Sequence, residues 1–311
     1  MIEKIRLRLL WFPQAQFVGA LLAEHRDFAS RRGYLLECQP VDFSEGPVSA
    51  ILSGNADLCI ASPSHMLESS EPESLVFLLT FQQTGSCVYL ARKDHDIDSI
   101  RCLAGKRIAV WPGSEDLELK WMLFKAGVPL SDIEFVPTVD TVEMLMDGQV
   151  SCAQMTTYNE YLKFLKFGGD ESTVLTLHAL DYDADLIKDG VVALKSWVES
   201  DTVRTQAVID SLLEGWTHAL HYQSDAIDLC KQIRADVEEG HHLMQYREIK
   251  KLIASGATKS HGLGFPHTDH LKKAANAVSD VEGRQFEFDV NRLVDKQYWQ
   301  AAEPSLRQSA W

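Results

Sequence analysis

Short apolar segments that are typical of buried strands alternate with segments of helical periodicity along the first part of the chain. Strands are expected at residues 5–11, 34–41 and 56–62. Residues 14–32 carry apolar side chains at helical spacing, and Gly33 ends that helix. Alternation of this kind favours parallel βαβ units and therefore an α/β fold.

The same alternation starts again after Lys93. Strands are expected at residues 106–111, 133–138 and 152–157, with helices between them. One further strand is expected at residues 191–194, and the rest of the chain has mainly helical periodicity. The sequence therefore predicts two α/β units followed by a helical tail.

This organisation predicts two lobes joined by a hinge. The first lobe comprises residues 1–90 and 189–311, including the helical tail, and the second comprises residues 91–188. The chain would cross between the lobes twice, near residues 89–93 and 181–190. Two crossovers allow hinge motion, so we expect a cleft between the lobes that closes on a ligand. We expect the protein to be a monomer.

Composition and charge argue against several classes of partner. The formal net charge of −15 disfavours binding to nucleic acid or to an anionic membrane surface. No apolar run approaches the roughly 18 residues that span a bilayer. Residues 1–8 alternate apolar and charged side chains and lack the apolar core of a secretory signal. The protein is therefore cytoplasmic if Met1 is the native start, and periplasmic if a signal has been removed.

The cysteines and histidines do not have the spacing of metal ligands. None of the six cysteines forms a C-x-x-C pair, and we expect buried free thiols without a structural disulfide, which fits a reducing compartment. We expect no metal and no cofactor, and no order of side chains indicates catalytic residues. The late histidines, none in an H-x-x-x-H pair, are His241, His242, His261, His267 and His270.

Four turns follow expected strands and would gather at the carboxyl ends of the sheets, where open α/β sheets bind ligands. In the first, Trp11 can stack on a flat ring and Gln14 can hydrogen-bond its edge, unless Trp11 and Phe12 are core residues. In the second, the Ser62 and Ser64 hydroxyls can meet acceptor groups, unless they only cap the helix that follows.

The third turn contains Trp111, Gly113 and Ser114. Gly113 would let backbone N–H groups approach a ligand. The turn is not a phosphate loop, because it lacks the G-x-x-x-x-G-K pattern and because Glu115 and Asp116 would repel phosphate. Helix capping is the structural alternative for this turn.

The fourth turn places a ring, an amide and a carboxylate in three consecutive residues, Tyr158, Asn159 and Glu160. This set suits an amino- or imino-bearing heterocycle: the tyrosine stacks, the asparagine pairs and the glutamate accepts an N–H. The alternative is a helix cap by Asn159 with Glu160 on the surface.

Residues 11–19, 105–113 and 155–160 resemble the family of receptors for thiamine-pyrimidine precursors, which also includes riboflavin-, sulfonate- and nitrate-type receptors of ABC transporters. Residues 189–192 and 212–216 fit later segments of that family. The resemblance implies a periplasmic-binding-protein type II fold with two α/β lobes. The positions that it implies for the ligand are Trp11, Gln14, Tyr158, Asn159 and Glu160.

Three further residues complete the set of expected ligand contacts: Gln83, at the end of an apolar strand, Asp189, and His65. The resemblance implies a solute-binding receptor that takes a thiamine precursor or a riboflavin-like heterocycle and delivers it to an ABC permease. The main function that the resemblance implies is therefore binding and not catalysis.

Two alternatives stay open. The first is a permease-free ligand sensor. The second is an enzyme similar to the thiamine-pyrimidine synthase branch of the family, which consumes pyridoxal phosphate and one of its own histidines. His65 falls at the position of that histidine, but Ala61 falls where the cofactor-bonding lysine would be. Residues 188–193 contain no cysteine, although that branch has a cysteine-rich strand there.

Overall fold

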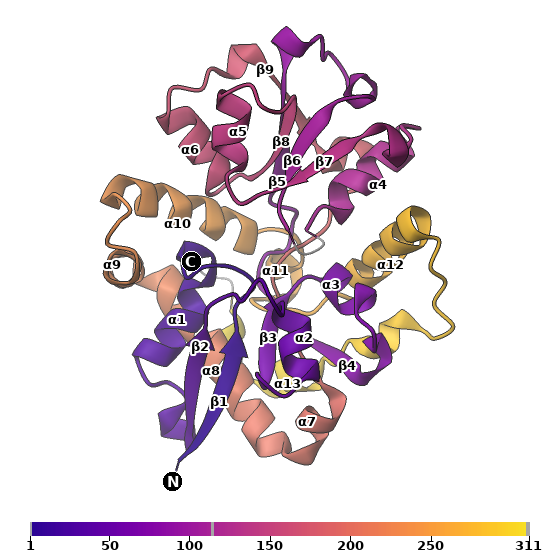
Figure 1. Ribbon diagram of the computed structural model, residues 1–311. Coiled ribbons are helices and arrows are strands. Elements are labelled where there is room, and N and C mark those ends of the chain that lie inside the picture. The colour runs from indigo at the N-terminus through magenta and orange to yellow at the C-terminus, as the bar shows by residue number, and fades with distance from the viewer. Residues whose placement is uncertain (1, 113–114, 309–311) are drawn as a thin grey trace. The chain divides into compact units, whose positions relative to one another are not determined.

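The computed structural model describes residues 2–112 and 115–308 of the 311-residue chain (Figure 1). The chain divides into two units. Unit 1 comprises Met1–Thr84, Ile187–Lys272 and Phe286–Trp311, and unit 2 comprises Gly85–Leu186 and Lys273–Gln285. The sequence predicts a second lobe at residues 91–188; the contiguous part of unit 2 begins and ends a few residues earlier, and a later segment joins it.

The sheet of unit 1 has the strand order β2-β1-β3-β10-β4. β1 pairs in parallel with β2 and β3, and β10 runs antiparallel between β3 and β4. The strands are β1 (Glu3–Arg8), β2 (Tyr34–Gln39), β3 (Leu58–Ala61), β4 (Leu75–Thr80) and β10 (Gly190–Leu194).

The helices of unit 1 begin at residues that favour helix starts. Pro47 and Pro63 occupy the first positions of α2 and α3, and the carboxylate of Asp201 accepts the Arg204 N–H at the start of α8. The helices are α1 (Val18–His25), α2 (Pro47–Leu52), α3 (Pro63–Glu68), α7 (Lys195–Ser200), α8 (Thr202–His221), α9 (Gln223–Ile233), α10 (Glu239–Ile253), α11 (Gly256–His261), α13 (Gln297–Ala301) and α14 (Pro304–Arg307). The expected helix at 290–299 is instead a short 3₁₀ turn followed by α13.

The closest helix packing in unit 1 joins α1 to α8. Gly19 of α1 faces the indole of Trp216, and a Cβ at Gly19 would lie 2.2 Å from two atoms of that ring. Gly215 lies equally close to α1, since a Cβ there would be 2.0 Å from the Gly19 carbonyl oxygen. The glycines thus allow two helices that are distant in sequence to touch through their backbones.

The sheet of unit 2 has the order β7-β6-β8-β5-β9. β6 pairs in parallel with β7 and β8, whereas β5 is antiparallel to both β8 and β9. The elements are β5 (Cys87–Arg92), β6 (Arg107–Val110), β7 (Glu134–Pro137), β8 (Cys152–Thr156), β9 (Val174–His178), α4 (Leu117–Lys125), α5 (Thr141–Met146) and α6 (Glu160–Lys166). Apolar side chains from β5, β6, β8, α5 and α6 form a core in this unit.

Helix α12 (Thr268–Glu282) begins in unit 1 and continues in unit 2. Its second part is held by unit 2 through polar contacts. Lys273 forms an ion pair with Asp185 at 2.5 Å, and the Trp121 indole N–H donates to Asp280 at 2.8 Å. These contacts explain why residues 273–285 belong to unit 2 although the sequence predicts a tail that belongs to the first lobe.

Both sheets are mixed, so the parallel pairing that the strand–helix alternation favours is present in only part of each sheet. β5 is the first strand after the chain leaves unit 1, and β10 is the first strand after it leaves residues 85–186. Neither strand follows a crossover helix of its own sheet, so the geometry that keeps βαβ units parallel does not apply to it. Within the described residues, no helix combines the length and the apolar character that a membrane crossing requires.

Candidate functional site

Polar residues from distant parts of the sequence meet at one edge of the unit 1 sheet. β1, β3 and β4 run in one direction and β10 runs in the other, so the residues after the first three strands lie at the same edge as the residue before β10. Gly190 pairs with the last residue of β3 and with the last residue of β4. This register brings Asp189 to Ser62 and to Phe81, whose N–H donates to the Asp189 carbonyl at 3.3 Å.

The Asp189 carboxylate accepts hydrogen bonds from two glutamine amides. Gln16 Nε2 donates to one carboxylate oxygen at 2.8 Å, and Gln82 Nε2 donates to the other. The chain of amides continues outward, because Gln14 Nε2 donates to Gln16 Oε1 at 3.0 Å and Gln245 Nε2 donates to Gln14 Oε1 at 3.3 Å. We call these five residues the amide network.

The amide network is buried. All five side chains are at most 8% exposed, and Asp189 is 3% exposed. Burying amides and a carboxylate is unfavourable unless each group keeps its hydrogen bonds. Apolar side chains could fill this edge without hydrogen-bond partners, so packing alone does not require polar residues here. A buried polar cluster at the carboxyl ends of strands in an open α/β sheet therefore indicates a ligand site.

Two polar atoms at this edge have no hydrogen-bond partner among the described residues, and both are on buried side chains. One is Gln82 Oε1, which can only accept, and the other is the Thr80 hydroxyl, which can donate or accept. A buried acceptor without a donor is costly, and a donor group on a bound molecule would relieve that cost. This edge is therefore suited to ligands that carry N–H or amino groups.

Ser62, Ser64 and His65 form a compact cluster at the start of α3. The Ser62 hydroxyl accepts from the His65 N–H at 3.1 Å and lies 2.7 Å from both the Ser64 hydroxyl and His65 Nδ1. The Ser62 N–H also lies 3.4 Å from Nδ1 and donates to it, which closes the cap at both ends. The capping alternative is thus present in the structure, and the three residues remain candidates for ligand contact.

Gln83 holds the polypeptide around it. Its amide donates to the carbonyls of Thr80 at 2.8 Å and Phe265 at 3.0 Å, and its Oε1 lies 3.4 Å from His270 Nε2. These bonds fix the segment after β4, including the neighbouring Gln82. Gln83 therefore positions the amide network, and direct contact with a ligand stays a prediction.

Trp11 belongs to an aromatic cluster with Phe12 and Phe43. Its ring makes edge contacts with Phe12 at 5.8 Å and with Phe43 at 5.0 Å between ring centroids. Phe12 is 42% exposed, so the alternative in which Phe12 is a core residue is wrong. The cluster presents aromatic surface next to the segment that carries Gln14.

The third expected turn lies partly outside the described residues, which do not include Gly113 and Ser114. Trp111, directly after β6, is buried, and its N–H donates to Gln154 Oε1 at 3.1 Å. The same glutamine donates to the Glu115 carbonyl at 2.7 Å and so joins both ends of the turn.

Tyr158, Asn159 and Glu160 are all buried. One Glu160 carboxylate oxygen accepts from the Thr156 N–H at 3.0 Å and from its hydroxyl at 2.7 Å, and the other accepts from the Asn159 amide. The alternative of a surface Glu160 is therefore wrong, and the Asn159 side chain bonds Glu160 instead of capping the helix. A ligand N–H that reached this carboxylate would share it with these internal donors.

Unit 2 contains a second buried carboxylate, Glu118 of α4, which the sequence reasoning missed. One of its oxygens accepts from the Tyr89 hydroxyl at 2.9 Å and the other from the Leu186 N–H at 2.6 Å. The pKa of Tyr89 is raised well above its usual value, mainly by burial and next by the nearby Glu118 charge, so the phenol stays a donor. Glu118 lies in an ordinary helical pattern, and no sequence signal distinguishes it from a surface glutamate.

The sequence reasoning also missed Gln16, Gln82 and Gln245. Gln82 lies beside Gln83 at the end of the largely apolar segment 75–81, so the signal that selects Gln83 applies to it as well. Gln16 lies two residues beyond Gln14. Gln245 lies in the middle of α10, where nothing in the local pattern marks it.

The thiols are protonated and inaccessible where they are buried. Burial raises the pKa of Cys152 and of Cys230 to about 12 and that of Cys59 further still. Among the described residues, no group of three or more histidine, cysteine or acidic side chains is placed to hold a metal ion.

Several solved structures resemble this chain over nearly their whole length. One is a putative periplasmic sulfonate-binding protein, SsuA, of an ABC transporter from Methylobacillus flagellatus KT (17% identity, 96% of this chain and 93% of that chain, TM-score 0.68). Another is a Candida albicans gene product described as having the generic periplasmic binding protein structural fold (14% identity, 94% and 96%, TM-score 0.66). A third is the desulfurization enzyme DSZB (12% identity, 96% and 98%, TM-score 0.63).

The class of protein follows from these likenesses and from the two mixed sheets: this is an α/β protein with the periplasmic binding protein fold, as the sequence predicts. The chain belongs to the NMT1/THI5-like family, whose profile matches residues 14–226, more than half of its length. No curated protein matches the chain in sequence. The matched region includes four of the five residues of the amide network.

Proposed function

We propose that this protein is a solute-binding receptor that binds a small aromatic heterocycle for uptake by an ABC transporter. Membership of the NMT1/THI5-like family and the fold shared with a sulfonate-binding receptor support a binding role. The heterocycle is of the thiamine-precursor or riboflavin type, whose ring nitrogens and amino groups match amide and carboxylate partners.

The amide network is the observation that carries this proposal. Gln82 Oε1 is a buried acceptor without a donor among the described residues, and it lies on the side chain whose amide bonds Asp189. A ring N–H or an amino group supplies the missing donor, while Trp11 and its aromatic neighbours offer a surface for the ring. Ligands without a donor would leave the acceptor unsatisfied and would be rejected.

Binding of this kind needs no chemical step. The network consists of amides and a carboxylate that already hold one another in place, so the ligand exchanges hydrogen bonds with water and leaves unchanged. The expected contacts of the second unit, Tyr158, Asn159 and Glu160, remain part of the proposal as separate positions to be tested.

The test begins with mass spectrometry of the small molecules that co-purify with the protein, followed by calorimetric titration with a panel of pyrimidines, pyridines and flavins. Asp189→Asn keeps the size of the side chain but removes its charge and replaces one of the two oxygens that accept from Gln16 and Gln82 with an N–H donor. We expect at least about tenfold weaker binding, the usual effect of disrupting a charge-assisted hydrogen bond.

Asp228→Asn is the matched control, because Asp228 also lies in unit 1 but has an exposed side chain. It removes the same charge from an exposed position that makes no hydrogen bond to the network, and it should bind like the wild type. If no heterocycle binds, or if Asp189→Asn binds as tightly as the control, the proposed function is wrong.

One observation favours a second candidate, an enzyme on the same fold. The Ser62 hydroxyl lies 2.7 Å from His65 Nδ1, which is the distance of a hydroxyl–imidazole pair, and an enzyme is among the similar structures. The helix cap also accounts for this pair. Recovery of the bound molecule after long incubation decides between the two: a receptor returns it intact, and an enzyme returns a product.

A further inference from the structure

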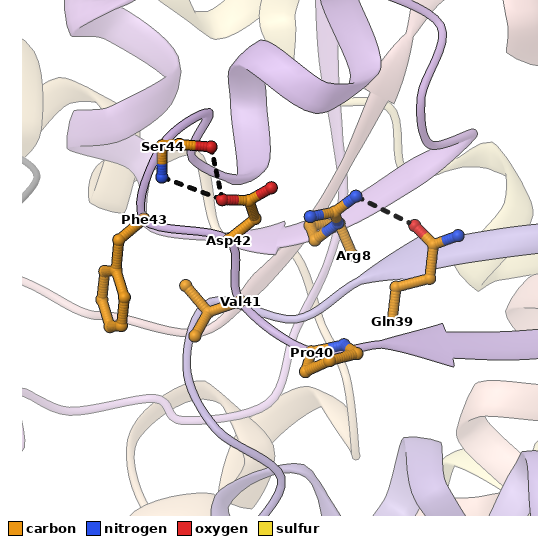
Figure 2. A pocket seen from close by; sticks show the side chains of 7 residues that line it. All are labelled: Arg8, Gln39, Pro40, Val41, Asp42, Phe43 and Ser44. Atoms are coloured by element: carbon orange, nitrogen blue, oxygen red, sulfur yellow. Dashed lines mark hydrogen bonds between the residues drawn. The ribbon is translucent and has the colours of Figure 1, made fainter.

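A concave region lies in unit 1 at the ends of β1 and β2, apart from the amide network. Its volume is about 590 Å³, and it is lined by Arg8 and residues 39–44 (Figure 2). This volume is within the range of small-molecule sites. None of these residues belongs to the amide network, so the cavity has its own chemistry.

Arg8 supplies a positive charge that its neighbours satisfy only in part. Its side chain is 12% exposed, and Nη2 donates to Gln39 Oε1 at 3.2 Å. The nearest carboxylate oxygen, on Glu45, is 4.0 Å away, and the other Glu45 oxygen accepts from Ser53 and Asn55 at 2.7 Å. Arg8 Nε is buried without a partner among the described residues. This guanidinium is therefore a donor available to an acid group.

Gln39 reinforces the donor character of this side of the cavity. Because its Oε1 already accepts from Arg8, its amide nitrogen is the end left to donate. An acid group placed here would meet a guanidinium and an amide together, which is the donor set of carboxylate recognition.

Asp42 gives the cavity an opposite charge. One of its oxygens accepts from both the N–H and the hydroxyl of Ser44, at 2.9 and 2.6 Å, which fixes the carboxylate at the turn. The Ser44 hydroxyl and N–H, with a smaller contribution from Arg8, lower the pKa of Asp42, so it is ionised near neutral pH. Its second oxygen is left for a cation or an N–H group.

The remaining wall is apolar and aromatic. Phe43 is 47% exposed, and Trp11 and Phe12 support its ring by edge contacts at 5.0 and 5.6 Å between centroids. Val41 and Pro40 extend this surface along the cavity (Figure 2). An exposed aromatic that is held in place by others is a suitable platform for an apolar or aromatic group.

We propose that this cavity binds a small zwitterion of the α-amino-acid class with an apolar or aromatic side chain. Arg8 and Gln39 take the acid group, Asp42 takes the amine, and Phe43 packs against the side chain. A simple anion would be repelled by Asp42 and a simple cation by Arg8, so both charges are needed on one molecule. The inference does not depend on the proposed function, which is carried by the amide network; the two share only the aromatic cluster of Trp11, Phe12 and Phe43.

The test is calorimetric titration of the full chain with three probes: L-phenylalanine, phenylacetate, which lacks the amine, and 2-phenylethylamine, which lacks the acid. We expect phenylalanine to bind and each analogue to bind at least about tenfold more weakly, because each loses one charge-assisted contact. The same loss for phenylalanine is expected in Arg8→Gln and in Asp42→Asn.

Phe43→Ala should also weaken phenylalanine binding, whereas Phe124→Ala, which removes an equally exposed ring from unit 2, should not. Asp42 and Phe43 are exposed, so these variants will fold even if Arg8→Gln does not. The proposal fails if no probe binds, if phenylacetate binds as tightly as phenylalanine, or if Asp42→Asn and Phe43→Ala bind like the wild type. Binding that is lost only in Asp189→Asn would place phenylalanine at the amide network and would overturn the proposal without affecting the proposed function.

Discussion

Replacing Gly19 by alanine tests whether α1 and α8 touch as closely as the structure has them. The added Cβ would lie 2.2 Å from two carbons of the Trp216 indole, whereas ordinary contacts begin at 3.4 Å, so a movement of at least 1.2 Å is required. Gly215 leaves no room for the helices to slide, because its own Cα hydrogens face the Gly19 carbonyl oxygen. The indole cannot turn freely either, since it is buried and packs against the ring of Phe81, with 5.3 Å between the ring centroids.

The change in the free energy of unfolding caused by Gly19→Ala is the difference between two effects. Overpacking of a well-packed core costs about 1–3 kcal/mol, and a rigid ring with a rigid neighbour puts Gly19→Ala near the upper end. Alanine is the better helix former by about 1 kcal/mol, which offsets part of this cost. We therefore expect a net loss of about 2 kcal/mol in the free energy of unfolding.

The assay is urea denaturation followed by far-ultraviolet circular dichroism. Gly240→Ala is the matched control, because Gly240 lies in α10 with no atom within 4 Å of an added Cβ, and it should change the midpoint little or raise it. Since Phe81 precedes Gln82, Gly19→Ala should also weaken ligand binding. Equal midpoints for the two variants would refute the packing argument.

Two further predictions concern buried polar groups. Glu118→Ala should cost about 2–5 kcal/mol in urea denaturation, because it leaves the Tyr89 hydroxyl and the Leu186 N–H buried without an acceptor; Tyr89→Phe removes one donor only and should cost less. Stability should fall as the pH rises from about 9 toward 12, because folding raises the pKa of Cys152 and Cys230 from 9.0 to about 12 and the unfolded thiols lose their protons first. Denaturation midpoints across this range should show a shallower decline in Cys152→Ala, and an unchanged decline would count against the buried thiol.

The periodicity of the sequence was sufficient to predict the two α/β units, because buried strands and amphipathic helices impose local patterns. Strand direction could not be predicted in the same way. β10 is antiparallel to its neighbours because the chain enters it from another unit. The apolar sequence of residues 190–194 would suit a parallel strand equally well, so it does not reveal the direction. Likewise, residues 273–285 belong to unit 2 through contacts of Lys273 and Asp280, which are ordinary surface residues in a helical pattern.

The candidate site was predictable in part. Gln14 was selected because it lies in the turn after an expected strand, and Asp189 was among the expected ligand contacts; both belong to the amide network. Gln245 reaches the network from the middle of a helix, and only the packing of α10 brings it there. The capping role of Ser62 was one of the two alternatives that the sequence offered. The role of Glu160 could not be predicted, because its carboxylate accepts hydrogen bonds from a neighbouring turn and this depends on backbone geometry.

The central claim is that a heterocycle binds at the amide network, and side-chain amide resonances report on it directly. In protein labelled with ¹⁵N-glutamine, titration with the best-binding heterocycle should shift the amide signals of Gln14, Gln16 and Gln82 with one common saturation curve. The amide of Gln297, which donates to Asp295 at 2.7 Å at the exposed start of α13, is the internal reference and should not shift. If the heterocycle saturates the protein while the three network amides stay unchanged, the ligand binds elsewhere and the account is contradicted.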